Sequence, residues 1–281
     1  MRSILKNILI PIDFSSASLN ALNTAINMAK RHQADLHLLN VHDISSFYPK
    51  IGQTDKFEPF TYNVFQKNKY LMKKIALAIL KDSQVNCHLY SEIGCMEKNL
   101  KKKAGDLNID LIVIGTTPDL YNKSYVFGTF PFRILKNVSC NVLTVPVKKT
   151  IDKFTRIIFP VFAKNDPMQR LYTARSIMKK NNSEISIVGI MGKNDGNLSS
   201  VVEAVSERVR SRRGMFTGFP TTNLLYIVNP ENEMSKICQD ANAELIVING
   251  TTDRNLKEFF FGNFTQKMIR NPETAVLCVK D

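Results

Sequence analysis

The chain has 281 residues, of which 44% are hydrophobic, and it carries a formal net charge of +13. This length suits roughly two domains, each able to bury a core without disulfides or metal. No apolar run reaches the ~18 residues of a membrane-spanning helix, and the start MRSILKNILIPIDF places charge too close to a short apolar segment for a signal peptide. We therefore expect a cytoplasmic protein with no membrane partner.

Short apolar strands alternate with helical patterns along the first half of the chain. Residues 8–12 (ILIPI) form the first predicted strand, and Leu22, Ala25, Ile26 and Ala29 recur on one face of the helix that follows. The other strands predicted in this half are residues 36–41, 86–91, 111–115 and 141–147. Because these strands are almost continuously apolar and alternate with helices, they predict a mostly parallel sheet with helices on both faces.

The second half of the chain repeats this order of strands. KNILIPIDF matches TRIIFPVFA, ADLHLLNVHD matches SEISIVGIMG, NIDLIVIGTT matches NAELIVINGT, and NVSCNVLTVPV matches NPETAVLCVKD. A fifth strand is predicted near residues 224–228. The sequence thus predicts an α/β protein with two tandem domains, residues 1–149 and 150–281, each built on a five-stranded sheet.

The segment from Gly115 to Thr129 has the spacing of a phosphate-binding loop. Two residues separate Gly115 from Pro118, and nine more separate Pro118 from Gly128 and Thr129. Glycines let the backbone approach an anion, while N–H groups at a helix start donate to phosphate oxygens. In open parallel sheets such a ligand binds at the carboxyl ends of the strands, where Asp13 and Val41 are also expected.

This pattern resembles the universal stress protein family, whose nucleotide-binding members show G-x-x-G, nine residues, then G-[S/T]. The resemblance extends to IPID at residues 10–13, to LLNVHD at 38–43, to Gly94 before the third helix and to the closing strand VLTVPV at 142–147. It covers almost the whole chain twice, so the chain is identified as a tandem member. The resemblance implies a Rossmann-like fold related to the adenine nucleotide alpha hydrolases.

The resemblance also implies a role for each residue of the loop. Asp13 would contact the adenosine, Val41 would offer its backbone to the base, and Gly115, Gly128 and Thr129 would frame the ribose and phosphates. Pro118 stands where the family has its second glycine, which removes one N–H donor. The ligand expected in the first half is therefore ATP or another adenine nucleotide.

The second half departs further from the family pattern. Phe162 stands at the position of Asp13, and the loop reads Asn249, Gly250, Thr251, Thr252, then Gly262 and Asn263. A ring at the adenine position is expected to obstruct binding, so this half is interpreted as a structural partner of the first. A different ligand that uses Thr251, Thr252 and Asn263 stays open.

The leading hypothesis is a noncatalytic stress-response protein that binds an adenine nucleotide in its first domain. The histidines are dispersed, and the five cysteines lack metal-ligand spacing, so neither a catalytic centre nor a metal site is predicted. The family resemblance implies that the last strands of the two halves meet edge to edge as an intrachain pseudo-dimer. A further homodimer and an unknown protein partner stay open.

Several alternatives remain beside this hypothesis. Asp13 could serve the strand-to-helix turn, a role that Ser15 or Ser16 could fill instead, and Gly115 could be a plain turn residue. The chain could be a nucleotide-free scaffold, or a relative of the electron-transfer flavoproteins. The lysines at 98 and 101–103 could attract nucleic acid, but a solvated helix face is the better interpretation because no recognition signature accompanies them.

Overall fold

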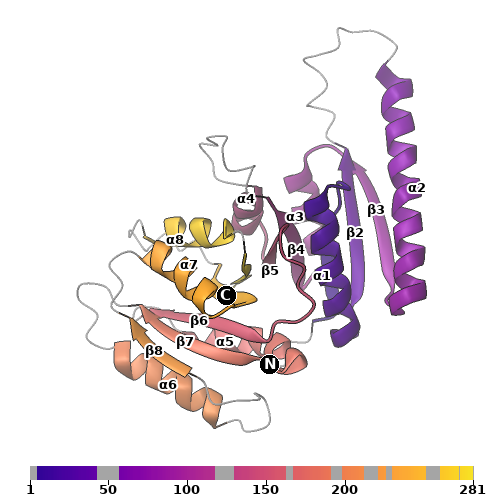
Figure 1. The fold of residues 1–281 in the computed structure, drawn as a ribbon. Helices are drawn as coiled ribbons and strands as arrows, with labels where there is room; N and C mark the ends of the chain where they lie inside the picture. The colour runs from indigo at the N-terminus through magenta and orange to yellow at the C-terminus, as the bar shows by residue number, and fades with distance from the viewer. Residues whose placement is uncertain are drawn as a thin grey trace.

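The frame of the molecule is a sheet of ten strands. In this computed structural model the described residues are 5–42, 57–117, 130–162, 167–190, 198–211, 221–225, 230–250, 260–271 and 273–280. The strands are β1 (Asn7–Pro11), β2 (Asp35–His42), β3 (Cys87–Ile93), β4 (Leu111–Thr116), β5 (Asn141–Pro146), β6 (Arg156–Phe162), β7 (Glu184–Ile190), β8 (Thr221–Leu225), β9 (Leu245–Asn249) and β10 (Ala275–Val279). Their order across the sheet is β3-β2-β1-β4-β5-β10-β9-β6-β7-β8 (Figure 1).

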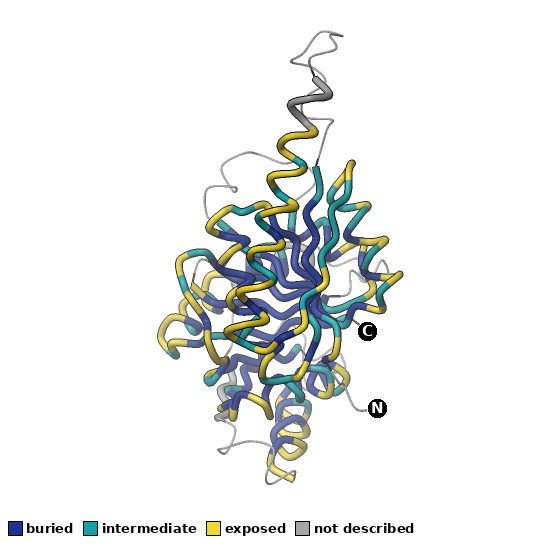
Figure 2. Tube along the Cα trace, turned by 90° about the vertical axis from the view of Figure 1, so that its right-hand side faces the viewer, coloured by how far each residue is buried: buried dark blue, intermediate teal, exposed yellow. Residues whose placement is uncertain are grey.

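Helices cover both faces of this sheet. Those that the structure describes are α1 (Ser16–His32), α2 (Phe57–Ser83), α3 (Met96–Asp106), α4 (Phe130–Asn137), α5 (Pro167–Asn181), α6 (Leu198–Arg210), α7 (Pro230–Asp240) and α8 (Phe260–Ile269). One face carries α1, α2, α5 and α6, and the other carries α3, α4, α7 and α8. Figure 2 shows the buried strands between these exposed outer layers. Burial on both faces explains why the strands are almost continuously apolar.

The two halves of the chain join through β5 and β10. Pairs within each half are parallel, whereas β5 and β10 are antiparallel, with Leu143 opposite Leu277 and Val142 opposite Cys278. The strands thus meet edge to edge, as the family resemblance implies. Two five-stranded units share one sheet, and the pairing covers two edges that would otherwise be open to other chains.

The segment between the halves is fixed to α1. The buried side chain of Asn20 donates from Nδ2 to the carbonyl oxygens of Pro146 at 2.8 Å and Lys149 at 3.0 Å. Farther along the segment, Ile151 and Phe154 are buried in the core on the same face of the sheet. This connection is therefore a packed part of the structure and not a loose linker.

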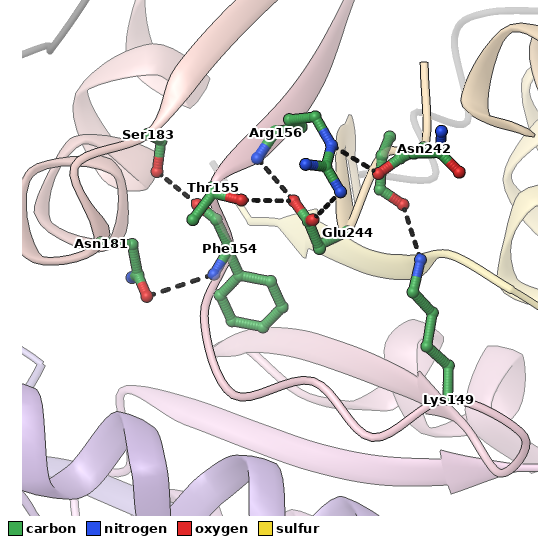
Figure 3. A network of polar contacts seen from close by, with 9 residues as sticks. Lys149, Phe154, Thr155, Arg156, Asn181, Ser183, Asn242 and Glu244 are labelled. Carbon is green, nitrogen blue, oxygen red and sulfur yellow. Dashed lines mark hydrogen bonds and ion pairs between the residues drawn. The ribbon is translucent and has the colours of Figure 1, made fainter. Parts of the chain in front are cut away.

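Both halves use the same acidic clamp at the start of the sheet. In the first half, Asp110 Oδ2 accepts the backbone N–H groups of Lys6 at 2.7 Å and Asn7 at 2.8 Å. In the second half, Glu244 accepts the N–H of Arg156 at 2.6 Å and also pairs with its guanidinium (Figure 3). The clamp ties the first strand of each half to the strand beside it, which is direct evidence of a structural repeat.

One strand begins earlier than predicted. The prediction placed the fifth strand of the second half near 224–228; β8 spans Thr221–Leu225, and residues 226–228 lie outside the described residues. Thr221 and Thr222 pair with Ser186 and Ile187 of β7, so the register of the neighbouring strand determines where β8 begins. Because β8 is an edge strand, polar residues are tolerated there, and apolar periodicity did not reveal them.

Candidate functional site

The first half has a topological switch point at β1. From β1 the chain passes outward to β2 and β3 and then returns to the opposite side of β1 at β4. In open parallel sheets, ligands bind in the crevice beyond the strand ends at such a point. Asp13, Val41 and Gly115 lie at the carboxyl ends of β1, β2 and β4, which are neighbours in the sheet. The fold thus brings these three predicted residues to one edge.

Asp13 is exposed and held in place by the residue that caps α1. Its Oδ1 accepts the Ser15 N–H at 2.9 Å and the Ser15 hydroxyl at 2.6 Å, while Ser15 Oγ accepts the Ser18 N–H. Burial alone would raise the pKa of Asp13, but the hydrogen bonds from Ser15 and Ser18 outweigh it and the pKa is lowered. Ser15 is therefore the helix cap, and Asp13 is an ionised carboxylate braced beside it.

The turn that carries Asp13 is tight. Phe14 has φ 64°, a left-handed conformation that bulky residues seldom adopt, and its side chain packs against the core. Such backbone conformations persist only where the surroundings enforce them, and they concentrate at functional sites. The turn directs α1 back across the sheet immediately after the Asp13 carboxylate.

Gly115 lies where the start of α1 crosses β4. A Cβ at this position would lie 2.1 Å from the carbonyl oxygen of Ala17 and 3.0 Å from the Ser18 nitrogen. No side chain fits there without a shift of backbone, so close helix packing requires the glycine. Ala17, Ala21, Ala25 and Ala29 extend this close contact, because they form a buried small-residue stripe on α1.

The end of β2 is fixed by polar contacts that the sequence did not indicate. Val41 is half-buried and packs toward the side of the sheet that carries α3. Asn40 is buried and donates from Nδ2 to the Ile12 carbonyl at 2.7 Å, and Asn68 of α2 donates to its Oδ1 at 3.4 Å. The signal for Asn40 was a polar residue inside the apolar run LLNV; nothing local pointed to Asn68.

His42 is half-buried at the end of β2, and its Nε2 atom is buried. Its ring meets Phe65 of α2 edge-on, at a centroid distance of 4.9 Å. Burial lowers the pKa of His42, so the ring is neutral near pH 7. The contact comes from a helix far along the sequence, which is why the strand pattern could not predict it.

The remaining predicted site residues are Pro118, Gly128 and Thr129, and they lie outside the described residues. The phosphate side of the site therefore stays a prediction.

At the corresponding edge of the second half, the strand ends differ. Phe162 ends β6, and its ring meets Phe264 of α8 edge-on at a centroid distance of 5.5 Å. Asn249 ends β9 at the position of Gly115, while Gly262 and Asn263 lie within α8. Thr251 and Thr252 lie outside the described residues. Aromatic packing thus replaces the exposed carboxylate of the first half.

Neither a metal-binding cluster nor a membrane-spanning helix occurs among the described residues. No group of three or more histidine, cysteine, aspartate or glutamate side chains among them could hold a metal ion. None of the helices in the described ranges is both long and apolar enough to cross a membrane.

One solved structure has the same architecture over the whole chain. A crystal structure of a universal stress protein from Archaeoglobus fulgidus aligns with 100% of this chain and 99% of its own, at 14% identity and a TM-score of 0.71. A universal stress protein solved in complex with cAMP aligns with 51% of this chain and 98% of its own, at 16% identity and a TM-score of 0.38.

Sequence comparison gives the family. A universal stress protein of Methanocaldococcus jannaschii is 31% identical over 146 residues, which cover 51% of this chain and 84% of that protein. The model of the universal stress protein family matches residues 5–146. This match contains the whole first half of the sheet, with Asp13, Val41 and Gly115 at its strand ends, and the chain belongs to the universal stress protein family.

Proposed function

We propose that the first half of this protein binds an adenine nucleotide, such as ATP, and responds to it without catalysing a reaction. The observation that carries the proposal is the exposed Asp13 carboxylate at the switch point, braced by Ser15 at the start of α1. An ionised carboxylate is an acceptor-only group, which suits the hydroxyl donors of a ribose. Membership of the family provides the ligand class.

In this proposal, residues at neighbouring strand ends contact different parts of the nucleotide. Both bonds from Ser15 end on Asp13 Oδ1, so we assign Oδ2 to the ligand. Asn40 and Asn68 hold the end of β2 against the end of β1, which keeps the backbone of Val41 in place for the base. We assign Gly128 and Thr129 to the phosphates on the family spacing alone.

The side chains around this edge favour a binding role over catalysis. Among the described residues at the ends of β1, β2 and β4, the titratable side chains are Asp13 and His42. The His42 ring faces Phe65 rather than Asp13, so no acid and base are paired there. Signalling would then follow from a ligand-dependent shift between conformations.

The second half acts in this proposal as a structural partner. Phe162 and Phe264 pack together where the first half exposes its carboxylate. An aromatic pair offers no acceptor to a ribose, and its separation would cost the packing between β6 and α8. The nucleotide stoichiometry expected for the chain is therefore one.

Isothermal titration with ATP tests the proposal. We expect binding to the wild-type protein and at least about tenfold weaker binding to Asp13→Ala, because a hydrogen bond to a charged group is worth about 1.5–3 kcal/mol. Phe162→Ala is the matched control from the second half and should bind as the wild type does. Absence of heat from the wild type at millimolar ATP would contradict the proposal and favour a nucleotide-free scaffold.

A further inference from the structure

The helix α2 lies at the outer edge of the molecule, over the edge strand β3 (Figure 1). Its inner face is recognisable from contacts at helical spacing. Phe65 meets His42, Asn68 meets Asn40, Met72 accepts the Ser91 hydroxyl, and Ile79 is buried in the core. These contacts account for one side of the helix and leave the opposite side facing outward.

The outward face of α2 carries large apolar side chains. Tyr62 is 63% exposed, Tyr70 57%, Leu77 67% and Leu80 51%. Five of the eight exposed large apolar residues in the described part of the chain belong to α2, the fifth being Val64. The spacing of Tyr70, Leu77 and Leu80 keeps them on one side of the helix, so they form a second apolar stripe that the core does not use.

The same face is strongly basic. Four exposed lysines accompany the stripe, namely Lys67, Lys73, Lys74 and Lys81, whereas Lys69 lies over the ring of Phe65 on the inner side. Within the described residues, none of them forms an ion pair with a carboxylate. The acidic side chain among residues 62–83 is Asp82. Lys74 lies over the ring of Tyr70, with 4.7 Å from Nζ to the centroid, so charge and apolar surface are interleaved.

We propose that the outward face of α2 binds an anionic lipid surface peripherally. Basic amphipathic helices with aromatic and leucine side chains bind such surfaces by burying apolar groups at headgroup depth while their lysines attract acidic lipids. From Tyr62 to Leu80 the stripe is about 27 Å long at ~1.5 Å per residue, and α2 is the outermost element on its side of the molecule, where a flat surface can reach it (Figure 1). A second copy of α2 is a poor occupant, because four lysines would face four lysines.

Co-sedimentation with lipid vesicles tests this binding. The wild-type protein should sediment with vesicles of phosphatidylcholine and phosphatidylserine, and remain in solution with phosphatidylcholine alone. The Lys73→Glu and Lys81→Glu double variant should lower the partition coefficient at least about tenfold, because each lysine near an acidic surface contributes roughly 1 kcal/mol. Leu77→Ser with Leu80→Ser should lower it by about as much through lost apolar insertion.

The matched control places the same charge change on another helix. Lys98 and Lys102 are exposed on α3, which carries none of the exposed large apolar residues. Lys98→Glu with Lys102→Glu should therefore sediment as the wild type does. The proposal is overturned if this control loses as much binding as the α2 variants, since net charge alone would then explain it. It is also overturned if the wild type does not bind acidic vesicles, which is the result expected if the face binds an acidic protein instead. Normal binding by the leucine variant would overturn it as well.

Discussion

The two halves of this protein share a sheet topology but differ at the strand ends where a ligand would lie. Asp13 and Phe162 occupy equivalent positions in the two repeats. Asp13 is an exposed carboxylate, whereas Phe162 packs against Phe264. Elements that build the sheet are kept, as the acidic clamps of Asp110 and Glu244 show. Within the described residues, the second repeat thus preserves the architecture of the sheet and has packed aromatic rings where the first repeat exposes a carboxylate.

The packing beneath the strand ends has also diverged. Gly115 admits the backbone of Ala17 so closely that no Cβ fits, whereas the second half places Asn249 at the same point. The tight approach of α1 to β4 is thus a property of the first half. It brings the start of α1, and with it Asp13, directly over the switch point.

Replacement of Gly115 should have the largest effect on stability, because it prevents the close approach of α1 to β4. Gly115→Ala places a methyl group against the carbonyl of Ala17, and we expect a loss of about 3 kcal/mol in the free energy of unfolding. Chemical denaturation measures it. Gly105→Ala is the control, because a Cβ at this position in α3 meets nothing within 4 Å and removes a helix-weakening glycine. Equal effects from the two substitutions would refute the close-packing role of Gly115.

The contact between the halves at His32 should make the free energy of unfolding depend on pH. Burial, with Arg31 and with Lys180 of the second half, lowers the pKa of His32 from 6.5 to about 4. The unfolded chain then binds a proton more readily between these values, so the free energy of unfolding should fall as pH drops from 6.5 toward 4. We expect His32→Gln to remove about 2 kcal/mol of this fall, measured by denaturation at both pH values.

The position of His32 in the first repeat is held by Asn181 in the second, which makes the comparison sharper. Asn181 Oδ1 accepts the Phe154 N–H at 3.2 Å and its Nδ2 donates to Ile177 O at 2.7 Å. An amide has no titration in this range, so Asn181→Ala should destabilise the protein equally at pH 4 and pH 6.5. An unchanged pH slope in His32→Gln would contradict the role of His32.

A substitution that loosens the connection between the halves should have the smallest effect on stability. Asn20→Ala leaves the carbonyls of Pro146 and Lys149 without their buried donor, at an expected cost of about 1.5 kcal/mol. Asn27→Ala is the matched control, because its bond to Asp152 is exposed and should contribute little. Thermal unfolding of both variants distinguishes them, and an equal shift would show that the segment does not depend on Asn20.

Much of the fold could be predicted from the sequence because the same series of strands and helices occurs in both halves. The order of the strands along the chain follows from matching ILIPI to IIFPV and LIVIG to LIVIN, and parallel pairing within each half follows from the intervening helices. Asp13, Val41 and Gly115 were placed at neighbouring strand ends by the same reasoning. Local patterns could not give the register, and so the prediction missed that β8 begins at Thr221.

Contacts between segments that are distant in the chain could not be predicted from the sequence. The clash that makes Gly115 necessary depends on where α1 crosses β4, and the ring contact of His42 depends on the position of Phe65 in α2. The outer stripe of α2 was also missed, because Leu77 and Leu80 look like core residues until the inner face of the helix is known. Periodicity identifies a helix face, but only packing shows whether that face is used.

Hydrogen exchange followed by mass spectrometry, with and without ATP, tests the difference between the halves most directly. ATP should slow exchange in peptides that contain the Asp13–Ser18 turn and the Asn40–His42 strand end. Peptides that contain Phe162 and the start of α5 should exchange at the same rate in both conditions. Protection of the second half at its strand ends, or no protection of the first, would contradict a single nucleotide site in the first repeat.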